Sequence, residues 1–245
     1  MQSFHFRHKK MKILIGCPTY EKYESHIDYW LDAVKKIINF SKEHKIDYLL
    51  VDNSKSNDFF EGIRAKGANI VRAPYSENAK ERIVNSRNIL REKVLNEGYN
   101  FFFSLEQDVI PEEDIIKKLL FQNKKIVSAY YGKQQELTVQ DKETGEIKKI
   151  IIEMPIAYVQ EGNLIRRAFP QELLNKGLIK VGALGLGCLL ISSEVLKKIK
   201  FRFEKDKKAY DDMYFCQDAK KLGYELFLNS EIKVKHLWKD WTKEK

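Results

Sequence analysis

The chain has 245 residues, with 44 Lys and Arg against 35 Asp and Glu, so its formal net charge is +9. A hydrophobic content of 43% supports a sizeable core and excludes a disordered chain. The longest apolar run, 181–191, is shorter than the roughly 17 residues that a membrane-spanning helix needs. The first ten residues lack the apolar core of a signal peptide. Three cysteines without a CxxC spacing favour a reduced, cytoplasmic protein with neither a disulfide framework nor a cysteine zinc site.

The first half of the chain alternates between apolar runs typical of buried strands and segments with apolar residues at helical spacing. These patterns predict strands at 12–17, 47–51, 69–71 and 100–105, and helices at 27–38 and 79–95. Pro111, followed by three acidic residues, is predicted to lie in the first turn of a further helix. Strands and helices that alternate in this way predict an α/β fold with a parallel sheet.

Polar residues follow three of the predicted strands. They are Pro18-Thr19-Tyr20, Asp52-Asn53-Ser54 and Glu106-Gln107-Asp108. Ligands of open α/β sheets bind beyond the carboxyl ends of the strands, so we expect a binding site where these three segments meet.

The second half has a different pattern. It predicts a strand at 126–131, a polar hairpin at 136–152 that turns near Thr144-Gly145, a Gly-rich segment running into a strand at 181–192, helices at 193–199 and 211–222, and strands at 225–228 and 232–234. Residues 154–180 show no clear pattern.

Glu106 and Asp108 are two carboxylates, one residue apart, at the end of a buried strand. Such a pair can face a divalent cation and a diphosphate together, because Mg²⁺ and Mn²⁺ prefer oxygen ligands, and Mn²⁺ also accepts imidazole. The alternative is an ordinary polar strand end before a helix.

Six segments in order over 11–238 resemble the GT-A glycosyltransferases, especially the large family 2. They are Ile15–Tyr20, Val51–Ser54, Ser86–Asn88, Phe101–Asp108 (similar to a strand ending in D-x-D), Gly185–Ile191 and Asp211–Cys216, with Val234–His236 similar to the closing x-His. The resemblance implies one GT-A domain with a mixed sheet flanked by helices. Its nucleotide-binding half would be 11–110 and its acceptor-binding half 111–238, with a flexible basic arm at 1–10 and a tail at 239–245.

The resemblance implies a Mn²⁺ or Mg²⁺ cofactor. Asp108 would be the principal metal ligand and His236 the second, while Glu106, in place of the first Asp of D-x-D, would face the ribose or water. The alternative for His236 is an exposed histidine after an edge strand.

The resemblance also implies a site for a nucleotide-diphosphate sugar. Pro18, Thr19 and Tyr20 would form its wall, Gln107 would join it, and Asp52 would contact the base or ribose. The alternative for Asp52 is an Asx turn.

Arg87, by the same resemblance, would pair with phosphate or hold the Asp loop, since a guanidinium suits both. Its alternative is an ordinary surface arginine of a helix.

Asp212 aligns with the Asp of the family's Glu-Asp pair and would be the base that takes the proton of the acceptor hydroxyl, with inversion at the sugar. Some GT-A families retain the configuration instead, and the sequence leaves that alternative open. Asp211 is the second candidate for this role. The alternative for both is to cap a helix and offset its dipole.

Two other classes of protein compete with this prediction. A nucleotidyltransferase of similar layout would carry a Gly-rich basic loop after the first strand, which Pro18–Glu21 is not. A nucleic-acid-binding protein would need basic residues interleaved with exposed aromatics, so we expect no nucleic-acid partner.

The net charge is concentrated at the two ends of the chain. Residues 1–12 carry +4 and residues 231–245 carry +2, which leaves +3 for the remaining 218 residues. We therefore expect the basic ends to be able to contact an anionic membrane from the cytoplasmic side, with a glycan, lipid or protein as acceptor.

Overall fold

The computed structural model describes residues 10–140, 144–162 and 164–237. The predicted tail at 239–245 and, except for Lys10, the predicted basic arm lie outside these residues, and so does part of each basic end. Among the described residues, no helix is both long and apolar enough to cross a membrane.

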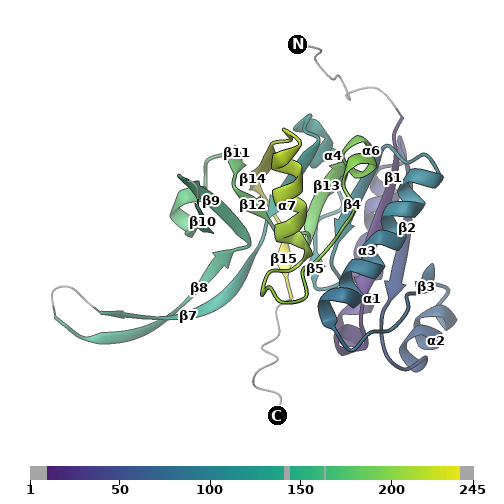
Figure 1. Cartoon of the computed structure of the whole chain (residues 1–245), viewed down its shortest axis with the longest axis horizontal. Helices are drawn as coiled ribbons and strands as arrows, with labels where there is room; N and C mark the ends of the chain where they lie inside the picture. The colour runs from purple at the N-terminus through teal and green to yellow at the C-terminus, as the bar shows by residue number, and fades with distance from the viewer. Residues whose placement is uncertain (1–9, 141–143, 163, 238–245) are drawn as a thin grey trace.

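An eight-stranded mixed sheet forms the centre of the α/β fold (Figure 1). The first four strands are parallel, as predicted, and β13 runs antiparallel between β4 and β6. In spatial order the sheet consists of β11 (Leu178–Val181), β14 (Leu226–Lys233), β6 (Ile126–Tyr130), β13 (Cys188–Ser192), β4 (Phe101–Leu105), β1 (Lys12–Thr19), β2 (Lys45–Asp52) and β3 (Ile70–Arg72).

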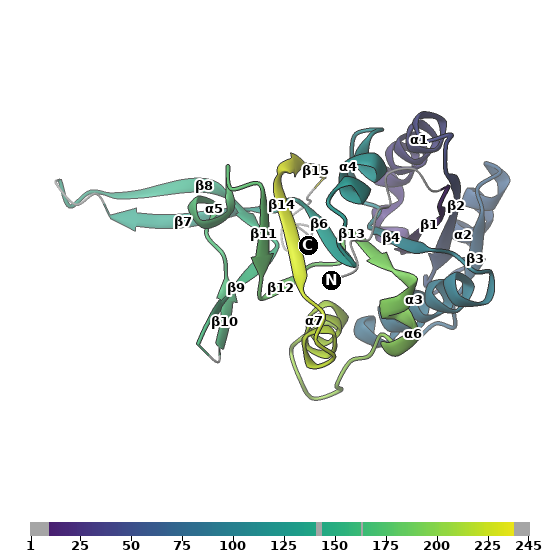
Figure 2. The ribbon, with the colours of Figure 1, turned by 90° about the horizontal axis from the view of Figure 1, so that it is seen from above.

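Helices cover both faces of this sheet, and Figure 2 shows the two layers. Side chains alternate along a strand, so Ile13 and Ile15 of β1 pack on one face and Leu14 packs on the other. The first face is covered by α1 (Glu24–Phe40), α2 (Asp58–Ala65) and α4 (Ile115–Phe121), and the second by α3 (Ala79–Asn96), α6 (Ser193–Lys198) and α7 (Asp211–Lys221).

Two local predictions are wrong. The helix expected at Pro111 begins only at Ile115, because the chain is still extended at Ile110, where β5 (Val109–Ile110) pairs with β15 (Lys235–His236). The two strands expected at 225–228 and 232–234 are the single strand β14, which keeps its place beside β6 through a register irregularity after Asn229.

Two smaller sheets lie outside the central one. The predicted hairpin forms β7 (Gly132–Gln140) and β8 (Ile147–Pro155) and is longer than expected. The segment without a clear pattern supplies β9 (Ala157–Glu161), β10 (Leu164–Arg167) and α5 (Pro170–Leu173); β9 and β10 form a three-stranded sheet with β12 (Ala183–Leu184). A short 3₁₀ helix, η1 (Glu21–Tyr23), follows β1.

The aromatic run Phe101–Phe103 is buried in β4, with each residue at most 2% exposed. These rings therefore cannot serve as a surface on which nucleic-acid bases stack.

The glycines before β13 pass directly against the buried Tyr131. The Gly187 N–H donates to the Tyr131 hydroxyl at 2.8 Å, and a Cβ added at Gly187 would lie 2.7 Å from that oxygen. At Gly185 an added Cβ would lie 2.4 Å from the same oxygen. The Gly-rich segment is therefore required by close packing of backbone on an aromatic ring.

We expect Gly187→Ala to lower the free energy of unfolding by about 1 to 3 kcal/mol, because the added methyl group must displace the Tyr131 ring. Urea denaturation measures this loss. The matched control is Gly62→Ala in α2, where an added Cβ meets nothing within 4 Å, and which we expect to raise the stability by up to about 1 kcal/mol. Equal effects of the two substitutions would contradict this packing argument.

Candidate active site

A cavity of about 480 Å³ opens at the carboxyl ends of β1, β2 and β4. This is the edge of the sheet at which the three polar segments were predicted to meet. Its lining combines three tyrosines, three cations and two carboxylates with smaller residues: Pro18, Tyr20, Lys22, Tyr23, Asn53, Ala79, Arg82, Ile83, Arg87, Glu106, Gln107, Asp108 and Tyr210.

Gln107 ties the loop after β4 to the end of β1. Its Oε1 accepts from the Thr19 hydroxyl and, at 3.2 Å, from the Tyr20 N–H, while its Nε2 donates to the Tyr20 carbonyl at 3.3 Å. Thr19 is buried and does not line the cavity. The amide of Gln107 thus holds Tyr20 in place beside the cavity.

Asp52 is fully buried and does not line the cavity. One carboxylate oxygen accepts from the Ser54 N–H at 3.0 Å and from the Ser54 hydroxyl at 2.5 Å, which is an Asx turn. Asn53 lines the cavity instead, and its side-chain amide donates to the Ser86 hydroxyl of α3 at 3.1 Å. Asp52 therefore shapes the loop that presents Asn53.

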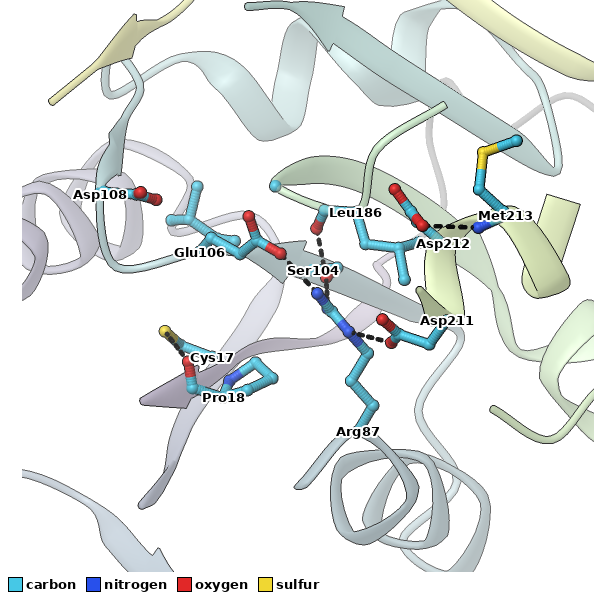
Figure 3. A network of polar contacts seen from close by, with 12 residues as sticks. Cys17, Pro18, Arg87, Ser104, Glu106, Asp108, Leu186, Asp211, Asp212 and Met213 are labelled. Atoms are coloured by element: carbon cyan, nitrogen blue, oxygen red, sulfur yellow. Dashed lines mark hydrogen bonds and ion pairs between the residues drawn. The ribbon is translucent and has the colours of Figure 1, made fainter. Parts of the chain in front are cut away.

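Arg87 is a buried arginine with three partners (Figure 3). Its guanidinium lies 2.5 Å from Glu106 and 2.6 Å from Asp211, and it donates to the Ser104 hydroxyl at 2.8 Å. The Ser104 hydroxyl in turn donates to the carbonyl of Leu186. Of the roles considered for Arg87, the geometry matches the one in which it holds carboxylates, and it links the loop after β4 to the start of α7.

Asp212 lies in the first turn of α7, next to Tyr210 and Asp211. Burial and the neighbouring charge of Asp211 raise the pKa of Asp212 to about 6, although its oxygen accepts from the Met213 N–H at 2.7 Å, which lowers it. Figure 3 shows Glu106 between Asp108 and Asp212. The N-cap position of α7 belongs to Tyr210, so neither aspartate caps the helix through its side chain.

Asp108 and His236 meet because β15 pairs with β5. The antiparallel pairing of His236 with Val109 brings His236 to Asp108, 128 positions away in the chain, and the His236 Nε2 lies 3.2 Å from an Asp108 carboxylate oxygen. The other ring nitrogen, Nδ1, lies 2.8 Å from the carbonyl of Gly132. Because a carbonyl can only accept, Nδ1 carries the proton there and, in the neutral ring, Nε2 presents a lone pair to the carboxylate.

A lone pair that faces a carboxylate needs a proton or a cation between them. Burial lowers the pKa of His236, but the contact with Asp108 and its charge outweigh burial, so that the pKa lies above its usual value. A backbone carbonyl that fixes the tautomer is also what orients a metal-binding histidine. The pair therefore fits a divalent cation as well as a proton.

Other ligands to such a cation would be oxygens of a bound molecule or water. Within residues 10–140, 144–162 and 164–237, no group of three or more His, Cys, Asp or Glu side chains could hold a metal ion. Glu106, whose side chain is 37% exposed, lines the same cavity but is held by Arg87. One carboxylate and one imidazole leave most coordination positions of Mg²⁺ or Mn²⁺ open.

Several residues that line the cavity are not among the site residues predicted from the sequence. Arg82 of α3 lies over the Tyr20 ring, with 4.9 Å between the guanidinium carbon and the ring centroid. Lys22 and Tyr23 belong to η1, and Tyr210 directly precedes the Asp211-Asp212 pair. Lys22 and Tyr23 come shortly after the predicted Pro18–Tyr20 segment in the chain. This closeness in sequence could have indicated that they belong to the site.

The fold is a Rossmann-like α/β fold with a mixed sheet, and solved structures share it. The first 349 residues of S. aureus TarS match with a TM-score of 0.53 and 15% identity over 91% of this chain, and the same protein in complex with UDP matches with 0.53 and 16%. A mycobacterial protein matches with a TM-score of 0.54 and 14% identity over 95% of this chain and 69% of its own. The chain spans 59% of the TarS structures. At these identities the likeness concerns the fold.

No protein-family model matches the sequence, and a search of curated proteins finds no match.

Proposed function

We propose that the chain is a metal-dependent glycosyltransferase that moves a sugar from a nucleotide-diphosphate sugar to an acceptor hydroxyl with inversion. The observation that carries this proposal is the arrangement of carboxylates around Glu106: the Asp108–His236 pair suits a cation, and Asp212 has a pKa near neutrality. The UDP bound by TarS, which shares the fold, supports a nucleotide donor.

The cavity walls suit a nucleotide diphosphate. Tyr20 and Tyr23 offer aromatic surface to a base or ribose, and Pro18 adds apolar surface. Lys22 and Arg82 bring positive charge to the same cavity, which complements phosphate. A cation held by Asp108 and His236 would neutralise the charge that develops on the diphosphate leaving group.

Asp212 is proposed as the general base. As the acceptor oxygen bonds to the anomeric carbon, its proton passes to the Asp212 carboxylate, and the bond from that carbon to the diphosphate oxygen breaks. A carboxyl group with a pKa of about 6 is ionised at neutral pH yet more basic than an ordinary aspartate. Asp211, paired with Arg87, serves to position α7.

A thermal-shift experiment with nucleotides tests the donor and the cation together. We expect UDP or a UDP-sugar with Mn²⁺ to raise Tm by roughly 5 to 10 °C at a concentration of about 100 times Kd. With EDTA the shift should be much smaller, because the diphosphate loses its counter-charge.

Asp108→Asn should remove the part of the shift that depends on Mn²⁺. The matched control is Asp114→Asn, an acid six residues on whose carboxylate pairs with Lys118 at 2.9 Å, outside the cavity. It should keep the full shift. If no nucleoside diphosphate or nucleotide sugar shifts Tm with or without a metal ion, the proposed function is wrong.

A further inference from the structure

The β7–β8 hairpin projects away from the central sheet as a long arm (Figures 1 and 2). Each strand has nine residues, which corresponds to about 30 Å of extended chain. Among the described residues the two strands form a sheet of their own. A two-stranded hairpin is marginal in water, and its outer edges present unpaired backbone groups to any other strand.

The outer edge of β8 is the more apolar of the two edges. Its centre is Ile150-Ile151-Ile152, and Ile151 is 70% exposed. Near the base of the arm, Arg167 donates to the carbonyls of Met154 and Pro155, so that part of the edge is already covered. The open part runs over 147–153, a β-branched segment without proline that natural proteins rarely leave uncovered.

We infer that β8 pairs antiparallel with β8 of a second copy of this chain, with the two-fold axis at Ile151. The two hairpins then merge into one four-stranded sheet. A two-fold axis pairs residues equally distant from it on either side, so Ile150 faces Ile152 of the second copy and Lys149 faces its Glu153. Directly opposed unlike charges and β-branched pairs both stabilise an antiparallel ladder.

Charge selects this register over its neighbours. Along β8, the backbone N–H and C=O groups of every second residue point away from β7, toward the second copy. Outward-pointing residues of the two copies must face each other, so the two-fold axis passes through a residue position and not between two residues. An axis at Ile150 would set Lys148 against Ile152, and an axis at Ile152 would set Glu153 against Ile151. Only the axis at Ile151 matches lysine with glutamate and isoleucine with isoleucine.

The charges of the arm also favour a second copy over an anionic membrane. Its described residues carry three lysines and three glutamates, so their net charge is zero. Two arms therefore do not repel each other through a net charge on these residues. Lys149 already lies 2.8 Å from Glu136 across the hairpin, with its side chain 71% exposed. The second copy's Glu153 would extend this pair into a row of alternating charges on one face.

The dimer would place the second copy beside the candidate active site. With the axis at Ile151, the ladder ends where Lys149 of the second copy faces Glu153, two residues before Pro155, which pairs with Gly132 at the base of the arm. Gly132 is the residue whose carbonyl holds His236. The inference itself does not depend on the proposed function.

Sedimentation velocity of the full chain over a wide concentration range tests the inference. We expect a reversible dimer, and we expect K149E and E153K each to weaken self-association about 100-fold, because each sets two like-charged pairs opposite each other. Both positions are exposed, so far-UV circular dichroism should show an unchanged fold.

Mixing the two variants is the decisive measurement. K149E and E153K together should form a heterodimer, because every opposed pair is then unlike, and the double variant K149E/E153K should dimerise by itself. A wild-type chain that stays monomeric at all concentrations, or a mixture that fails to associate, would overturn the inference. So would a monomer that binds lipid vesicles and loses that binding in Ile151→Lys.

Discussion

Under the proposed function, Asp212→Asn is expected to lower glycosyl transfer by at least about 100-fold while any UDP binding persists. The amide keeps the shape of the side chain and can still accept from the Met213 N–H, but it cannot take a proton from the acceptor. Steady-state turnover and a UDP thermal shift measure the two effects separately. Wild-type turnover should rise with pH through about 6, as the Asp212 carboxyl ionises.

The same substitution should stabilise the protein at neutral pH. The folded chain holds the proton of Asp212 up to about pH 6, whereas an unfolded chain releases it near the ordinary value of 3.8. The contribution of Asp212 to stability therefore falls as the pH rises from about 4 to 6 and then stays level. Above pH 6, the free energy of unfolding of Asp212→Asn should exceed that of the wild type by up to about 3 kcal/mol. This difference should vanish near pH 4.

Asp218→Asn is the matched control on α7. Asp218 pairs with Arg202 at 2.7 Å, and this pairing lowers its pKa. Turnover should be retained, and any change in stability should have the opposite sign to that of Asp212→Asn. Full activity of Asp212→Asn would exclude Asp212 as the base.

Arg87→Met should cost about 3 to 5 kcal/mol of stability. The substitution leaves Glu106 and Asp211 without the guanidinium that neutralises them, and Asp211 is only 3% exposed. Loss of one partner of a buried ion pair is costly because the remaining charge stays out of water. Equilibrium denaturation in urea, with both the folded and the unfolded baseline recorded, measures this loss of stability.

Two further variants separate the role of the charge from that of the volume. Arg87→Met combined with Asp211→Asn should recover part of the stability, since one stranded carboxylate is removed. Arg64→Met, at an exposed arginine of α2 that lies 3.8 Å from Glu61, should change stability by less than about 0.5 kcal/mol. If Arg87→Met unfolds at the urea concentration of the wild type, the ion pairs do not stabilise this site.

The parallel strands and the edge at which their polar ends gather could be predicted from local patterns. β1 and β4 are buried on both faces, so both read as continuous apolar runs. The sheet formed by β9, β10 and β12 could not be predicted, because its partly exposed strands show no regular alternation. The start of α4 was misplaced because the short β5–β15 pairing keeps the chain extended at Ile110.

Within the candidate site, residue types were easier to predict than their contacts. Asp52 and Asn53 are adjacent, and the direction of the chain at the end of β2 decides that Asn53 lines the cavity while Asp52 holds the turn. For Arg87 the sequence left phosphate and carboxylate partners open, and packing of α3 against β4 and α7 supplies the carboxylates.

By itself, the sequence determined the α/β class of the chain, the strands of the parallel half and the candidate residues at their ends, because burial imposes periods that can be counted along the chain. Only the tertiary structure decided which of these residues meet. His236 reaches Asp108 through the β15–β5 pair, and Arg87 joins Glu106 to Asp211 across more than 100 positions of sequence. Contacts between such distant residues follow from how the elements pack, and packing leaves no periodic signal in the order of the amino acids.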